Sequence, residues 1–145
     1  MKSVMIAKSA CCVAIALLAL NCPELGAQES VGKSSDASQL PAAGVKKIVD
    51  TVHEKMPGTK VLLLGVFPRG GKADDPRRLK LAEINKIIST FGDGSKTRYL
   101  DITKAFLEPD GTLTKEVMHD YLHPTERGYE IWYEQMKPVL DEMMK

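Results

Sequence analysis

Cysteine is scarce in this chain of 145 residues, and it is confined to the beginning of the chain. All three cysteines, Cys11, Cys12 and Cys22, precede residue 23. The rest of the chain therefore has no disulfide, no thiol nucleophile and no thiolate metal site. An excess of charge of one sign is also absent, because the formal net charge is only +1. With no basic stripe interleaved with aromatic residues, this balance gives no indication of a nucleic-acid partner.

The sequence also has no apolar run long enough for a membrane span. The run over residues 9–20 is shorter than the about 20 residues that a spanning helix requires. It follows Lys2 and Lys8 and precedes the small residues Gly26 and Ala27. A basic start, a short apolar middle and a small-residue end predict a secretory signal peptide over residues 1–27 and a secreted or periplasmic protein. A retained N-terminal anchor is the alternative.

Residues 28–40 are polar and rich in serine, which predicts a linker. Residues 27–34, AQESVGKS, match a relaxed phosphate-loop pattern. A working phosphate loop needs a strand before it and a helix after it, and neither is predicted here. We therefore predict no nucleotide, and we assign residues 41–145 to one domain.

Within that domain, helical and strand-like patterns alternate. The predicted order is helix, strand, helix, strand, helix, over residues 41–56, 61–66, 76–91, 97–102 and 124–144. This order predicts an α/β fold with a parallel sheet. Two strands are few for a sheet, and we expect residues 61–66 to present an unpaired edge that favours self-association.

Asp120 and His123 form the candidate catalytic pair. A carboxylate three residues before a histidine can hydrogen-bond one imidazole nitrogen and stabilise the imidazolium when the other nitrogen takes a proton. The spacing allows one short loop to present both groups. The spacing alone also fits a surface pair or a helix cap.

Other polar residues carry weaker indications. His119 and His123 stand four apart, but Pro124 disfavours a helical His123 and no third ligand is evident, so no metal site is predicted. Asp101 is predicted to cap a loop. Arg77 and Arg78 are predicted to lie on a solvated helix face.

Three segments, taken in order, resemble a known family. They are VLLLGVFPRG at residues 61–70, RYLDI at residues 98–102, and FLEPDGTLTKEVMHDYLHPTERGYEIW at residues 106–132. Together they resemble the C-terminal half of the SGNH, or GDSL, esterase and acylhydrolase family. The nearest branch resembles the catalytic α-subunits of intracellular platelet-activating factor acetylhydrolase.

The resemblance implies a flavodoxin-like three-layer α/β/α fold, the SGNH hydrolase fold, of which residues 41–145 would supply only the last two parallel strands and their flanking helices. It implies ester hydrolysis by a Ser-His-Asp mechanism without metal or cofactor. In that mechanism His123 matches the general base and Asp120 the acid that orients it.

The family's nucleophile block, Gly-Asp-Ser, has no match here. Residues 91–96, FGDGSK, contain an extra glycine and follow a helix. The asparagine block is also absent, because the only asparagines are Asn21 and Asn85. We therefore expect a truncated or split esterase, inactive alone.

Such a chain would act on an ester substrate only when a complementing chain supplies the missing half. A homo-oligomer is the other partner state that we expect. The alternatives are a secreted non-catalytic interaction module derived from the fold, and an unstable fragment without function.

Overall fold

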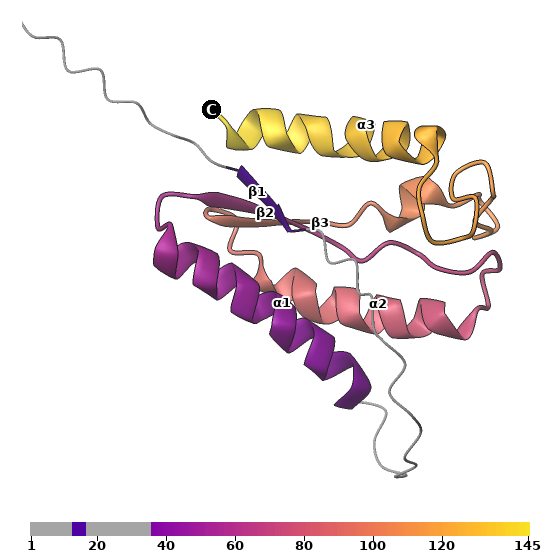
Figure 1. The fold of residues 1–145 in the computed structure, drawn as a ribbon, viewed down its shortest axis with the longest axis horizontal. Coiled ribbons are helices and arrows are strands. Elements are labelled where there is room, and N and C mark those ends of the chain that lie inside the picture. The colour runs from indigo at the N-terminus through magenta and orange to yellow at the C-terminus, as the bar shows by residue number, and fades with distance from the viewer. Residues whose placement is uncertain (1–12, 17–35) are drawn as a thin grey trace, which may run out of the picture.

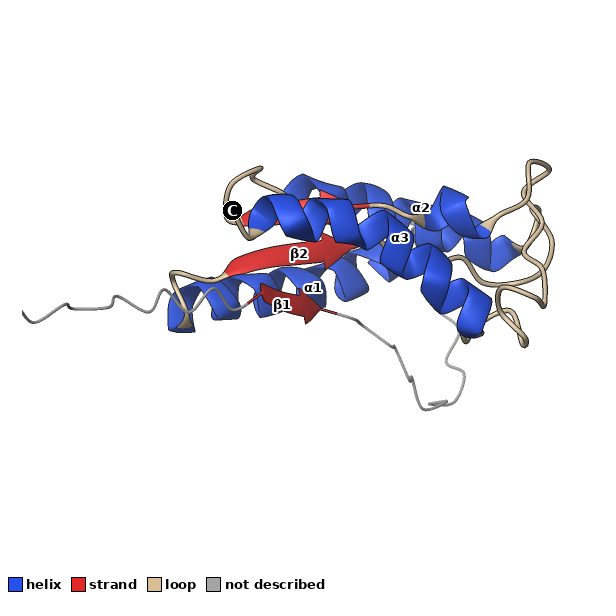
Figure 2. Cartoon of the chain, turned by 90° about the horizontal axis from the view of Figure 1, so that it is seen from above, coloured by secondary structure: helices blue, strands red, loops and turns tan. Residues whose placement is uncertain are grey.

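The computed structural model describes residues 13–16 and 36–145, in which three α-helices enclose a three-stranded parallel sheet (Figure 1). The elements are, in order, β1 (Val13–Ala16), α1 (Asp36–Lys55), β2 (Lys60–Leu64), α2 (Pro76–Ile88), β3 (Thr97–Leu100) and α3 (Glu126–Met143). Helices α1 and α2 cover one face of the sheet and α3 covers the other (Figures 1 and 2). The predicted fold class, a partial three-layer α/β/α arrangement, is confirmed.

Strand β2 is apolar throughout because both of its faces are covered. Leu63 packs on one side with Ile88 of α2, whereas Leu62 and Leu64 pack on the other side with Met143 of α3. All three leucines are buried. A strand buried on both faces needs a continuous apolar run rather than an alternating one, and this is the pattern of residues 61–64.

The sheet contains one strand more than the two predicted. Strand β1 pairs in parallel with β2, and β3 pairs with β2 on the opposite side. The expectation of an unpaired edge at residues 61–66 is therefore wrong, since β2 is the central strand. Strand β1 lies within the run assigned to a signal peptide. The rest of residues 1–27, the linker residues 28–35 and the phosphate-loop match at 27–34 lie outside the described residues.

Two helices begin at positions other than the predicted ones. Helix α1 starts at Asp36, inside the predicted linker, and the Ser38 hydroxyl in its first turn donates to Glu83 of α2 over 2.9 Å. Helix α3 starts at Glu126 rather than Pro124, because the Thr125 side chain caps it. In both cases a polar side chain, which apolar spacing does not report, makes a hydrogen bond near the start of the helix, and for α3 this bond is a cap.

Helix α3 continues through Pro138 to Met143, although a proline inside a helix usually kinks or ends it. Helix α2 starts at Pro76 as predicted, with the Asp75 side chain accepting a hydrogen bond from the Arg77 backbone. Among the described helices, none combines the length and the apolar character that crossing a bilayer requires.

The turn before β3 leads to a pH prediction. Asp93 Oδ1 accepts hydrogen bonds from the backbone N–H groups of Thr97, Ser95 and Lys96, and these lower the pKa of Asp93 to about 2. A lowered pKa in the folded state stabilises the fold above the unfolded-state value of 3.8, and that stabilisation is lost as the pH falls towards 2. We expect Asp93→Ala to lower the urea midpoint at pH 7, and the difference from the unsubstituted chain to narrow at pH 2. An equal difference at both pH values would contradict this.

Candidate functional site

One short loop, between Met118 and Pro124, carries the candidate catalytic pair beyond the carboxyl ends of β2 and β3 (Figure 1). An isolated antiparallel bridge joins Met118 to Pro124, and the Thr125 N–H donates to the Val117 carbonyl over 2.9 Å. Within the loop, Tyr121 adopts the left-handed backbone conformation, with a φ of 61°. This conformation is costly for a residue with a side chain, so the surrounding contacts must hold the loop in a defined shape.

Asp120 and His123 are in direct contact. The Asp120 Oδ2 atom lies 2.7 Å from His123 Nδ1. The other carboxylate oxygen, Oδ1, accepts hydrogen bonds from the His123 N–H at 2.8 Å and the Leu122 N–H at 3.0 Å. The His123 N–H, followed by the His123 ring, holds the pKa of Asp120 well below its usual range. An ionised Asp120 can therefore orient the imidazole and stabilise its protonated form.

The remaining ring nitrogen of His123, Nε2, has no hydrogen-bond partner in the described part of the chain. The serines of residues 36–145 are engaged elsewhere: Ser38 donates to Glu83, Ser89 to the Lys86 carbonyl and Ser95 to Asp93. The pair is thus a base and its orienting acid, without a hydroxyl bonded to the base among these residues.

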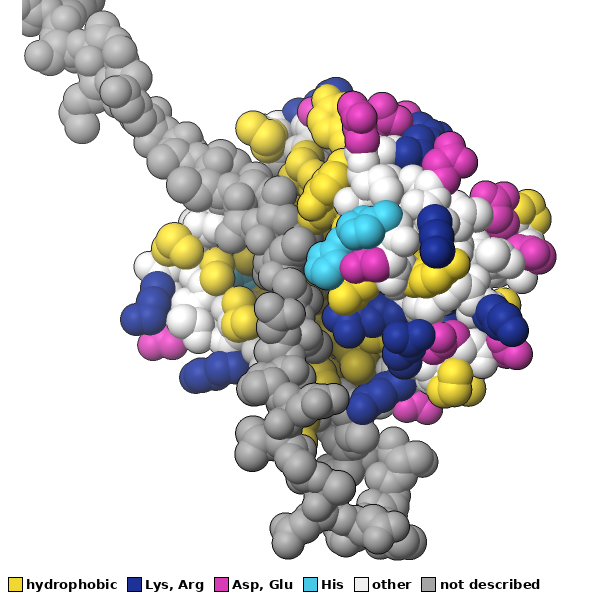
Figure 3. Space-filling model, turned by 45° about the vertical axis from the view of Figure 1, so that its right-hand side comes forward, with side chains coloured by type: hydrophobic (Ala, Val, Ile, Leu, Met, Phe, Trp, Pro, Cys, Tyr) yellow, Lys and Arg dark blue, Asp and Glu magenta, His cyan; other side chains and the backbone are white. Residues whose placement is uncertain are grey.

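His119 lies next to the pair. Its ring is nearly parallel to that of His123, with 6.2 Å between the centroids and 23° between the planes. Its Nε2 atom lies 3.8 Å from Asp120 Oδ2. Figure 3 shows histidine side chains beside an acidic side chain on an exposed face of the molecule.

The segment after β2 is hydrogen-bonded to the loop that carries the catalytic pair and to the chain just before it. The Gly70 N–H donates to the Tyr121 carbonyl over 3.3 Å, and the Leu113 N–H donates to the Gly71 carbonyl over 3.0 Å. Gly71 also lies against the Tyr121 ring so closely that an added Cβ would lie 2.9 Å from it. The Pro-Arg-Gly turn that carried the family resemblance thus holds the histidine loop.

Arg78 binds the loops that contact the histidine loop, so the prediction that it lies on a solvated helix face is wrong. Its half-buried guanidinium donates to three carbonyl oxygens: Arg69 at 2.9 Å, Gly70 at 2.8 Å and Gly111 at 3.1 Å. Spacing on α2 could not show this, because all three acceptors are backbone groups of loops outside the helix. The neighbouring Arg77 is exposed and pairs with Asp75.

We expect Arg78→Ala to lower the free energy of unfolding by about 2 kcal/mol, because it removes charged donors from three carbonyls near the loop. Arg77→Ala is the matched control and should cost much less, because an exposed ion pair contributes little to stability. Urea unfolding of both variants measures the difference. Equal losses would show that the Arg78 contacts do not stabilise the loops.

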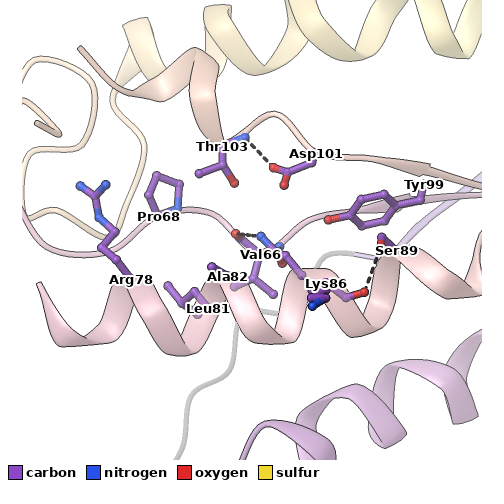
Figure 4. Close-up of a pocket in the computed structure, with 11 residues that line it drawn as sticks. Val66, Pro68, Arg78, Leu81, Ala82, Lys86, Ser89, Tyr99, Asp101 and Thr103 are labelled. Carbon is purple, nitrogen blue, oxygen red and sulfur yellow. Dashed lines mark hydrogen bonds between the residues drawn. The ribbon is translucent and has the colours of Figure 1, made fainter. Parts of the chain in front are cut away.

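A cavity of about 350 Å³ lies nearby, between α2 and the end of β3 (Figure 4). At its rim, Asp101 accepts a hydrogen bond from the Thr103 N–H at 2.8 Å, which confirms its predicted role as a loop cap. Burial, followed by the Asp101 charge, raises the pKa of Tyr99. Neither His123 nor Asp120 lines this cavity.

Asn85 also lines the cavity but is structural. Its side chain accepts from the Val66 N–H at 2.7 Å and donates to the Val66 carbonyl at 3.0 Å. It therefore fixes the chain just after β2. The amide oxygen and one amide N–H are used in this way.

Comparison with known proteins places this geometry in context. A family model described as the GDSL-like Lipase/Acylhydrolase family matches residues 17–131. The chain is 34% identical over 87 residues to human platelet-activating factor acetylhydrolase IB subunit alpha1, a match covering 59% of this chain and 37% of that protein. It is 34% identical over 89 residues to the rat subunit alpha2, with 61% and 38% covered. The chain thus spans about two fifths of the length of the curated relatives that it matches.

A solved structure shares the fold. A GDSL-like lipase from Bacteroides thetaiotaomicron superimposes with a TM-score of 0.57 at 19% identity, covering 72% of this chain and 53% of the lipase. The superposition supports a partial α/β/α hydrolase fold.

Proposed function

We propose that this chain, which belongs to the GDSL-like lipase/acylhydrolase family, supplies the histidine–aspartate part of an ester-hydrolysing site. The observation that carries the proposal is the 2.7 Å contact between Asp120 Oδ2 and His123 Nδ1, which leaves the Nε2 atom of His123 to act as the base. The substrate class is a carboxylic ester with an acetyl or other short acyl group.

In the proposed reaction, a serine hydroxyl attacks the ester carbonyl while His123 Nε2 removes its proton. Asp120 stabilises the imidazolium that forms. The alkoxide departs and takes this proton from His123, so that the acyl group remains on the serine. Water, deprotonated by the same nitrogen, hydrolyses the acyl-serine to the acid and restores the hydroxyl.

The nucleophile in this proposal comes from outside the described residues. Each of the three described serines already donates its hydroxyl elsewhere, and no Gly-Asp-Ser block is recognisable in the sequence. A second polypeptide that carries the serine and the oxyanion donors would complete the site. Without it, we expect the chain alone to be nearly inactive.

The test is reconstitution. The full chain is mixed with an N-terminal fragment of a GDSL-family relative that contains the Gly-Asp-Ser and asparagine blocks, and hydrolysis of p-nitrophenyl acetate is measured. We expect activity from the mixture and almost none from either part alone. If the mixture fails while the two parts bind each other, the proposed role is wrong.

A further inference from the structure

We propose that His119, Asp120 and His123 form a binding site for a divalent transition-metal ion such as Zn²⁺, and that a bound ion switches off the base. The binding itself is independent of the proposed function, whereas its inhibitory consequence rests on it. The sequence alone offered two histidines without a third ligand. The structure supplies the third ligand, because Asp120 Oδ2 lies within 4 Å of a nitrogen of each ring.

The three ligand atoms are close to a metal-binding arrangement. One atom from each side chain can be chosen so that all lie within 4.8 Å of one another. Asp120 Oδ2 is 2.7 Å from His123 Nδ1 and 3.8 Å from His119 Nε2. In a tetrahedral site with metal–ligand bonds of about 2.0–2.2 Å, neighbouring ligand atoms lie about 3.3–3.6 Å apart. Small rotations of exposed side chains bridge this difference.

The site is partly organised before any ion arrives. Two backbone N–H groups hold Oδ1 of Asp120, which leaves Oδ2 directed at the imidazoles. The two rings are already nearly parallel. The histidine side chains are about two-thirds exposed, 64% for His119 and 66% for His123, so an ion and a fourth ligand water can reach them from solvent.

The ligand types select the ion. Two imidazoles and one carboxylate suit zinc, nickel or copper, whereas calcium and magnesium prefer oxygen ligands only. We therefore expect no binding of Mg²⁺ at concentrations at which Zn²⁺ binds.

Metal binding and base catalysis exclude each other at His123. A neutral imidazole has one lone pair and one N–H. If the ion takes the lone pair of Nδ1, the ring proton resides on Nε2, which then donates and cannot accept a proton from a hydroxyl. The ion also occupies the carboxylate that would otherwise stabilise the imidazolium.

Nuclear magnetic resonance of the full chain tests the binding. The chain contains three histidines, so the ring Cε1–H signals are few and each can be assigned by substitution. Substoichiometric Ni²⁺ should broaden the signals of His119 and His123 and spare that of His53, which contacts Thr97 instead. Equal broadening of all three signals, or none, would overturn the proposal.

His119→Ala tests the metal site while leaving the catalytic pair of Asp120 and His123 in place. The substitution should raise the Zn²⁺ concentration needed to shift the His123 signal by at least about tenfold, because it removes one of three ligands. In the reconstituted enzyme, the Zn²⁺ concentration that halves hydrolysis should rise by the same factor. Unchanged values with His119→Ala would contradict the site. Metal binding without reconstituted hydrolysis would leave the site standing and count against the proposed function alone.

Discussion

Replacing His123 with alanine should abolish ester hydrolysis by the reconstituted enzyme. The imidazole is the only group of the described chain that the proposal assigns to proton abstraction, and loss of a member of a Ser-His-Asp site lowers the rate by about 10⁴-fold or more. The effect should appear in kcat, because the substrate contacts remain. Progress curves with p-nitrophenyl acetate measure it directly.

His53→Ala is the matched control. His53 is half-buried on α1 and lies 3.3 Å from Thr97 Oγ1, remote from the Asp120 loop in sequence and in contacts. It should leave kcat within about twofold, since it touches no reacting group. The kcat of Asp120→Asn should lie between those of His53→Ala and His123→Ala. The substitution retains much of the shape of the side chain but loses the charge that stabilises the imidazolium. Full activity of His123→Ala would exclude this histidine as the base.

Gly128→Ala should produce the second large effect, on both stability and activity. Gly128 is buried in the first turn of α3, where an added Cβ would collide with the Val117 carbonyl and lie 2.9 Å from Pro124 Cβ. Val117 and Pro124 flank the loop that carries the catalytic pair. Overpacking against backbone typically costs about 1–3 kcal/mol, which exceeds the gain in helix propensity.

The same substitution at Gly44 provides the control with the opposite sign. Gly44 also lies in a helix, α1, but apart from its chain neighbours and the nearby backbone of the helix no atom lies within 4 Å of a Cβ built there. Gly44→Ala should therefore stabilise the chain by up to about 1 kcal/mol. Thermal or urea unfolding of the two variants, with reconstituted hydrolysis for both, measures the contrast. Equal stabilities would mean that α3 does not pack closely against the loop.

Much of the fold follows from patterns that are local in the sequence. The continuous apolar run at residues 61–66 predicts β2, and Asp75 followed by Pro76 predicts the start of α2. The Asp-x-x-His spacing correctly places Asp120 and His123 on one short loop. Each of these depends on contacts between near neighbours, which spacing can report.

The features that failed or were missed depend on contacts between distant segments. Arg78 binds carbonyls of two other loops, and the closeness of Gly128 to Val117 exists only after α3 has folded back. Strand β1 was missed, because it lies in an apolar run whose spacing does not indicate a strand, and its pairing with β2 joins segments distant in sequence. The sequence did contain one indication of the close packing at Gly128, because a glycine inside an otherwise helical stretch often has a packing reason.

The most direct measurement is to find which serine becomes covalently modified. The chain alone, and the chain mixed with the complementing fragment, are treated with a fluorophosphonate, and the labelled peptide is identified by mass spectrometry. The account predicts no label on this chain and, in the mixture, label on the Gly-Asp-Ser serine of the fragment that disappears with His123→Ala. Label on a serine of this chain alone, dependent on His123, would contradict it.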